Sequence, residues 1–249
     1  MKKNVISVAL VLALVLPAFV KAESHLSSNF SVASNYVFRG LSYNSQGTTY
    51  NSQGQPVVQG SVDYIYNSDF VNLGASFFAG PADTFNTQSY VMERDTEADT
   101  FLTASNKIND NFSCGLGYNY YSFMKNVDND STEWTAFFNY KKFNLINGYT
   151  DRFSGVDTNQ NRTVASIKPE LKKNISLDLR VGYNNFCNPT AVATSNYYDY
   201  LTGLVFTSEG FTFEVAYTNT INRINLINNQ YSKTDGTFTV SLSKNIEVF

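Results

Sequence analysis

The chain has few of the side chains that enzymes use for acid–base or metal chemistry. It holds one histidine, His25, and two cysteines, Cys114 and Cys187. Hydrolysis by serine or aspartate usually needs a positioned histidine as general base, and a zinc site needs several His or Cys ligands. Gly115–Gly117 lacks the third glycine and the following helix of a phosphate-binding loop. We therefore expect no enzyme, no catalytic residue, no metal and no cofactor.

The remaining chemistry lies in charged residues that alternate with apolar ones. In the stretch "ISLDLRVGY", the apolar residues share one parity, whereas Asp178 and Arg180 share the other. Such a period of two is typical of a β-strand with two different faces. In a membrane, an arginine facing lipid at mid-depth costs about 2–4 kcal/mol, so the charged parity must face inward. The predicted pore-lining residues are Asn35, Arg39, Gln59, Asp63, Asp99, Glu133, Asp178, Arg180, Asp199 and Glu214.

About twelve segments show this alternation or can be placed between turn signals. The predicted strands are 30–42, 57–66, 70–79, 93–105, 112–122, 132–141, 143–152, 163–171, 175–185, 197–206, 211–219 and 237–248. Short connections (67–69, 107–111, 142, 172–174 and 207–210) alternate with long ones (43–56, 80–92, 123–131, 153–162, 186–196 and 220–236).

This alternation of connection lengths favours a membrane barrel over a soluble sandwich or lipocalin, because the two ends of a soluble fold are not distinguished in this way. Outer-membrane barrels have an even number of strands, short periplasmic turns and longer outside loops. The predicted fold class is therefore all-β: a transmembrane antiparallel up-and-down β-barrel of about twelve strands.

The first 22 residues read as a secretory signal peptide. Lys2 and Lys3 precede an apolar stretch, and Val20 and Ala22 supply the small residues of a cleavage site. We expect a cleaved signal peptide at 1–22 and a single barrel domain at 23–249. The net charge of −3 becomes more negative when the leader's lysines are removed, which argues against nucleic acid as a partner.

The cysteines are expected to be free thiols. Cys114 follows a short connection, whereas Cys187 lies at the opposite end of its strand, a membrane thickness away. A disulfide needs Cα atoms about 4.4–6.8 Å apart.

The first predicted strand contains "SNYVFRGLSYN", with Phe30, Val32, Tyr36 and Phe38 expected to face lipid and Arg39 expected in the lumen near the outer end. The polar stretch that follows repeats "YNSQG", which we interpret as a tandem duplication within an outside loop.

This stretch, together with "PVVQGSVDYIYNSDF", "YLTGLVFTSEGFTFEVAYTNT" and the closing "VSLSK", resembles the TorF-type (Gcw_chp) family of candidate bacterial outer-membrane porins. The resemblance covers nearly the whole mature chain. It implies an outer-membrane barrel with a porin assignment, and it brings no catalytic residues.

Two functions remain open. The first is a channel for passive passage of small hydrophilic solutes in the outer membrane of a Gram-negative bacterium, leaning towards cations because acidic residues outnumber basic ones on the inward-facing parity. The second is a barrel plugged by arginine–carboxylate pairs that acts as a surface scaffold or adhesion protein. The expected partners are outer-membrane lipid and lipopolysaccharide, the barrel-assembly machinery during biogenesis, and the solutes.

Overall fold

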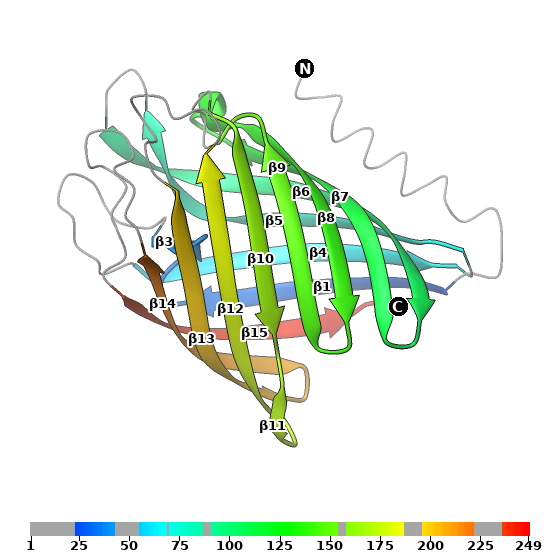
Figure 1. Ribbon diagram of the computed structural model, residues 1–249. Coiled ribbons are helices and arrows are strands. Elements are labelled where there is room, and N and C mark those ends of the chain that lie inside the picture. The colour runs from blue at the N-terminus through cyan, green and yellow to red at the C-terminus, as the bar shows by residue number, and fades with distance from the viewer. Residues whose placement is uncertain are drawn as a thin grey trace.

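A computed structural model of the chain describes residues 23–42, 55–68, 70–86, 91–153, 158–186, 196–221 and 236–249. These residues form a closed barrel of twelve antiparallel strands (Figure 1). The predicted signal peptide, the duplicated "YNSQG" and Cys187 lie outside the described residues. Among the described residues, no helix is long and apolar enough to cross a membrane.

Each wall strand pairs with its neighbour in sequence, and the first strand closes the barrel against the last. The wall strands are β1 (Glu23–Ala33), β4 (Val57–Asn67), β5 (Asn72–Asn86), β6 (Val91–Asn109), β7 (Phe112–Phe123), β8 (Ser131–Tyr140), β9 (Phe143–Thr150), β10 (Gln160–Ile167), β12 (Ile175–Phe186), β13 (Tyr197–Ser208), β14 (Phe211–Ile221) and β15 (Thr237–Glu247). The short strand β11 (Glu170–Lys172) pairs with β12 beyond Pro169, which interrupts the line of β10 because proline cannot donate to the ladder.

The two ends of the barrel differ. One end, here the turn end, carries the connections 68–71, 110–111, 141–142, 173–174 and 209–210, and the chain ends at the same end. At the opposite end, the loop end, the described residues break off after 42, 86, 153, 186 and 221 and resume at 55, 91, 158, 196 and 236, and the connection 124–130 lies at the same end. At the turn end, Glu209 and Gly210 both have positive φ (51° and 77°), as a two-residue type I′ hairpin requires.

The predicted strands are present, with one correction to a connection, one to the strand at 163–171 and one to the first strand. The long connection predicted at 80–92 is wrong, because β5 continues to Asn86 and β6 begins at Val91. The strand predicted at 163–171 divides into β10 and β11. Both errors come from strands that extend or break where the alternation of apolar residues is weak.

The first strand begins seven residues earlier than predicted, at Glu23, and ends at Ala33. Phe30 and Val32 are 54% and 42% exposed on the outer face, as expected. At Ser34 the chain leaves the wall: its backbone N–H donates to the carbonyl of Val240 (2.8 Å), and its hydroxyl accepts from the Val240 N–H (2.9 Å). The prediction that Tyr36 and Phe38 face lipid is wrong, because the apolar alternation continues beyond the point where the strand ends.

The outer face of the barrel is apolar and ringed by aromatic side chains. Near the loop end, the rings of Tyr118 and Trp134 lie 4.8 Å apart between centroids. Near the turn end, Phe206 and Phe213 lie 6.2 Å apart. An apolar band bordered by aromatic residues at both edges is the outer surface of a barrel that lies in a membrane.

The inner face is polar, and two of its glycines allow charged side chains to lie flat against the wall. A Cβ on Gly148 of β9 would lie 2.5 Å from Oε1 of Glu133, and one on Gly182 of β12 would collide with the carboxylate of Asp199. Glycine at these two positions therefore leaves room for carboxylates from neighbouring strands, which would otherwise project into the middle of the lumen.

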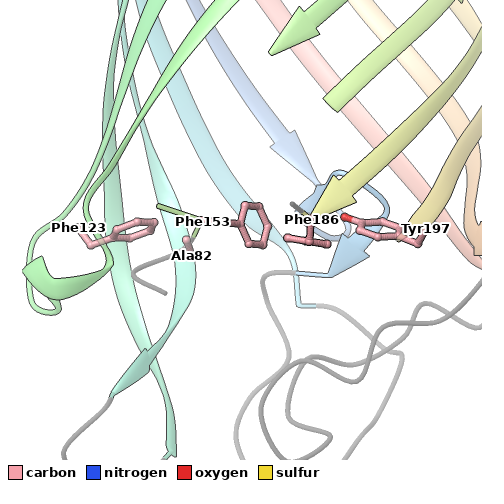
Figure 2. Packing of buried hydrophobic residues seen from close by; sticks show 5 residues of the cluster. All are labelled: Ala82, Phe123, Phe153, Phe186 and Tyr197. Atoms are coloured by element: carbon pink, nitrogen blue, oxygen red, sulfur yellow. The ribbon is translucent and has the colours of Figure 1, made fainter. Parts of the chain in front are cut away.

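A cluster of apolar side chains lies inside the barrel at the loop end. Figure 2 shows its members inside the barrel at the loop end: Ala82, Phe123, Phe153, Phe186 and Tyr197. Tyr36 and Phe38, which precede the end of the first described segment, pack against this cluster. An apolar cluster inside a polar-lined barrel indicates that protein side chains, rather than water, fill the lumen where the cluster lies.

Candidate functional site

The segment that lies inside the lumen at the loop end is a small hairpin of two strands, β2 (Val37–Phe38) and β3 (Leu41–Ser42). Its turn is Arg39-Gly40, and both residues have positive φ (53° and 77°), the pattern of a type I′ turn. A Cβ on Gly40 would lie 2.7 Å from side-chain atoms of both Asp199 and Thr220. The tip of the hairpin therefore lies directly against the wall strands β13 and β14.

Arg39 anchors the hairpin. Its side chain is 5% exposed, and its Nη2 donates to Oε1 of Glu133 at 2.8 Å. Its Nη1 donates to Oε1 of Gln160. The guanidinium carbon lies 4.7 Å from the ring centre of Phe38 and 5.6 Å from that of Phe153. The Tyr197 hydroxyl donates to the Arg39 backbone carbonyl (3.1 Å).

On one side of Arg39, Glu133 is held by wall residues as well. Its Oε2 accepts from the Tyr121 hydroxyl at 2.8 Å and from the Asn119 side-chain amide at 3.2 Å. Tyr121 in turn packs its ring edge-on against Phe38, with centroids 5.9 Å apart. The carboxylate is therefore positioned by β7 and β8 and meets the hairpin arginine with its other oxygen.

On the other side, the contacts continue along β10, β12 and β13. Gln160 donates to Oδ1 of Asn184 (3.3 Å), and Asn184 donates to Oδ2 of Asp199 (2.7 Å). Arg162 pairs with Asp199 at 3.2 Å. All the members named here except Arg162 are buried. The two halves of this network meet at Arg39, so the hairpin arginine links buried side chains of β8, β10, β12 and β13, which lie on one side of the barrel.

A second group of carboxylates lines the same level on β6. Asp95 accepts from the backbone N–H groups of Lys125 and Asn126 (2.9 Å each), and Glu97 accepts from the Tyr36 hydroxyl (2.9 Å). Asp99 is 2% exposed, and its Oδ1 has no hydrogen-bond partner among the described residues. Within the described part of the chain, neither Glu97 nor Asp99 forms an ion pair with a basic residue.

The space beside this network is small. A cavity of about 20 Å³ lies between Phe38, Glu97 and Tyr121, which is room for about one water molecule. Among the described residues, no group of three or more His, Cys, Asp and Glu side chains is placed to hold a metal ion.

The predicted pore-lining residues all lie on the inner face or in the hairpin segment. Asn35 and Arg39 belong to the buried segment after β1, and Asp99, Glu133 and Asp199 lie in the wall beside it. Gln59 lies on β4 opposite Gly80, next to the same level. The other predicted residues lie towards the turn end: Asp63, Asp178, Arg180 and Glu214.

These four residues at the turn end form fewer hydrogen bonds and ion pairs than the residues around Arg39. Asp63 accepts from Ser61 (2.8 Å) and from Ser76, and Asp178 lies 3.6 Å from the Lys168 ammonium group. Arg180 and Glu214 form no hydrogen bond or ion pair among the described residues, and both are partly exposed. The structure therefore brings Arg39, Glu133, Asp99 and Asp199 together at one level and leaves this group apart.

Sequence reasoning missed several members of the network. The missed residues are Asp95, Glu97, Asn119, Tyr121, Gln160, Arg162 and Asn184. A signal existed for the first two, because Asp95, Glu97 and Asp99 occur at alternate positions and therefore share one face of a strand. Gln160 and Arg162 precede the predicted start of their strand, so their parity was not considered.

Comparison with known proteins identifies the family. Residues 20–246 match the model of a family described as bacterial protein of unknown function (Gcw_chp). The chain belongs to this family. The resemblance noted from the sequence is therefore confirmed for Gcw_chp, whereas the description of Gcw_chp names no activity. No curated protein matches this Gcw_chp chain in sequence.

Solved structures share the fold of this Gcw_chp protein at low sequence identity. A chain from a study of the in-meso crystallisation of membrane proteins is 10% identical, with 90% of this chain and 84% of that chain covered and a TM-score of 0.57. An outer-membrane channel from Pseudomonas putida F1 is 9% identical, with 92% and 97% covered and a TM-score of 0.52. The CymD monoaromatic hydrocarbon channel is 8% identical, with 89% and 87% covered and a TM-score of 0.50. These likenesses confirm the predicted fold class, an antiparallel barrel of the outer-membrane type.

Proposed function

We propose that this protein is an outer-membrane channel for small hydrophilic solutes, closed at its loop end by the β2–β3 hairpin. The long connections of outer-membrane barrels face outside, so the hairpin lies at the external mouth. The signal-peptide pattern at 1–22 supports export, and the polar inner face supports a water-filled path through the turn-end half.

The observation that carries this proposal is the way the hairpin is held. Residues 35–42 are not hydrogen-bonded into the wall as a strand; they fold inward and are fastened by side chains, above all by the Arg39–Glu133 pair. Side-chain contacts of this kind open and close without breaking the barrel ladder, whereas a plug that formed part of the sheet would not. The closed lumen is therefore one state of a channel.

The cation preference expected from the sequence is retained in this proposal. The inner face carries carboxylates on β4, β6, β8, β12, β13 and β14, and fewer basic groups oppose them. Charges inside a narrow lumen are screened less than charges on the surface, so an acidic lining favours cations.

The second candidate function is a permanently plugged barrel that acts as a scaffold or adhesion protein. The buried network around Arg39 is the observation that favours it, because such contacts hold the hairpin rigidly against the wall. The two functions differ in one measurable respect, which is whether weakening the hairpin contact produces ion conductance.

The test is conductance in planar bilayers of the purified wild-type barrel and of two variants. Arg39→Ala removes the buried pair, and we expect it to raise the fraction of time that the channel is open. Lys107→Ala is the matched control, because Lys107 and Asp110 form an ion pair of similar length (2.9 Å) that is exposed at the turn end. Silence of the folded Arg39→Ala barrel would contradict the channel proposal and favour the plugged scaffold.

A further inference from the structure

The lumenal site that holds the Arg39 side chain has the parts of a receptor for a guanidinium group. Two oxygen acceptors approach the guanidinium from different wall strands, Glu133 on β8 and Gln160 on β10. The ring of Phe153 provides an aromatic face 5.6 Å from the guanidinium carbon. A planar ion with several donors in one plane fits such a combination of carboxylate, amide oxygen and ring, which a compact ammonium ion fits less well.

This receptor is held in place without help from the hairpin. Tyr121 and Asn119 fix Glu133, whose carboxylate also lies in the notch over Gly148. Asn184 accepts a hydrogen bond from Gln160. All of these residues belong to the barrel wall, so withdrawal of the hairpin leaves both acceptors where they are. A binding site whose groups are already positioned loses little entropy when a ligand arrives.

Withdrawal of the hairpin also leaves negative charge uncompensated. Glu133 loses its cationic partner, and a buried charge without a partner is costly. Glu97 loses the Tyr36 hydroxyl at the same time. Independently of the hairpin, Asp99 is 2% exposed and has an oxygen without a hydrogen-bond partner among the described residues. The vacated site therefore contains a guanidinium-sized receptor next to two further carboxylates.

We propose that this site binds small cationic guanidino compounds from outside the cell and that Arg39 is a tethered competitor for it. This inference rests on the proposed function, since it names the solute that replaces the hairpin and passes into the lumen. A compound that carries a second positive group should bind most tightly, because Glu97 and Asp99 lie beside the receptor. Tethering gives Arg39 a high effective concentration, of the order of millimolar, so a free guanidino compound must compete with it.

The first test measures binding and does not depend on conductance. Calorimetric titration of agmatine, which carries a guanidinium and an ammonium group, into folded Arg39→Ala barrel in detergent should show saturable binding at least tenfold tighter than into the wild type. Adding Glu133→Gln to Arg39→Ala should weaken this binding by tenfold or more. Adding Glu247→Gln should leave it unchanged, because Glu247 is exposed on β15 at the turn end.

Matched ligands separate guanidinium recognition from a general attraction for cations. Putrescine has two ammonium groups and no guanidinium, and urea has the planar shape without the charge. Equal affinity of Arg39→Ala for putrescine and agmatine, or no loss of agmatine binding on Glu133→Gln, would overturn the proposal. If Arg39→Ala does not fold, Arg39→Lys replaces it, because lysine keeps the positive charge but lacks the planar guanidinium. Agmatine should bind Arg39→Lys more tightly than it binds the wild type, and equal binding would overturn the proposal.

The second test uses the wild-type channel. Agmatine added on the loop side should raise the open fraction at concentrations at which putrescine and potassium do not. If agmatine binds as predicted but no variant conducts, the receptor stands and the channel function fails. If the channel conducts but agmatine neither binds Arg39→Ala nor raises the wild-type open fraction, the channel function stands and the receptor fails.

Discussion

The Arg39–Glu133 contact should control how often the lumen opens, and a double-mutant cycle tests this most sharply. The two side chains are 5% and 7% exposed and meet at 2.8 Å. A hydrogen bond to a charged group contributes about 1.5–3 kcal/mol, against about 0.5–1.5 for a neutral one. Glu133→Gln keeps an acceptor oxygen for the guanidinium, which stays charged, but removes the attraction between two opposite charges, so we expect it to weaken closure by about 1–2 kcal/mol.

This free energy converts into a measurable change in gating. Because about 1.4 kcal/mol corresponds to a factor of ten, Glu133→Gln should raise the open-to-closed ratio by about 5–30-fold. Arg39→Ala loses the whole contact and should raise the ratio further, by roughly 30–150-fold for about 2–3 kcal/mol. In the Arg39→Ala background, Glu133→Gln should add little, since its partner is already absent.

The assay is the open probability of single channels in planar bilayers, with each variant checked for folding by heat-modifiable gel mobility. Glu247→Gln serves as the control for loss of one carboxylate at an exposed position. Strict additivity would refute the reasoning: if Glu133→Gln has the same effect with and without Arg39, the pair is not what holds the hairpin.

Three further predictions concern the barrel and its lumen. Cys114 lies at the turn end of β7, on the order of 30 Å at about 3.3 Å per residue from the loop end, where β12 ends at Phe186, the residue before Cys187; maleimide should therefore label two thiols in the unfolded chain without reductant, and a mass that shows an intramolecular disulfide would contradict the topology. Leu116→Arg, on the outer face and 64% exposed, should lower the free energy of unfolding in lipid by about 2–4 kcal/mol, and no loss of stability would mean that this face does not contact lipid. Reversal potentials of the open channel in a KCl gradient should show cation preference at neutral pH and less at acid pH, because protonation removes lumenal negative charge; anion preference at neutral pH would contradict the acidic lining.

Much of the wall could be predicted from the sequence, because a strand between water and lipid is forced to alternate. The parity of Asp178 and Arg180, for example, follows directly from the cost of a charge in lipid. The same rule places Glu133 and Asp199 on the inner face. Such local patterns need no knowledge of which strands are neighbours.

The hairpin could not be predicted in this way. In "NYVFRGL", the apolar residues that pack against the inner aromatic cluster have the same spacing as residues that face lipid, so the alternation fits either environment. The Arg39-Gly40 turn was the available signal, since type I′ turns favour glycine at a position with positive φ. The partners of Arg39 come from strands about a hundred residues further along the chain, and that closeness results from barrel closure rather than from any local pattern.

Deleting the hairpin tests the central claim most directly. Replacement of residues 36–42 by a flexible glycine–serine linker leaves every wall strand intact, because the wall strand β1 ends at Ala33. If the β2–β3 hairpin closes a channel, single-channel recordings of this variant should show a steady open conductance, whereas the full-length barrel should be closed for most of the recording. A folded, heat-modifiable deletion variant that remains as silent as the full-length barrel would contradict the account.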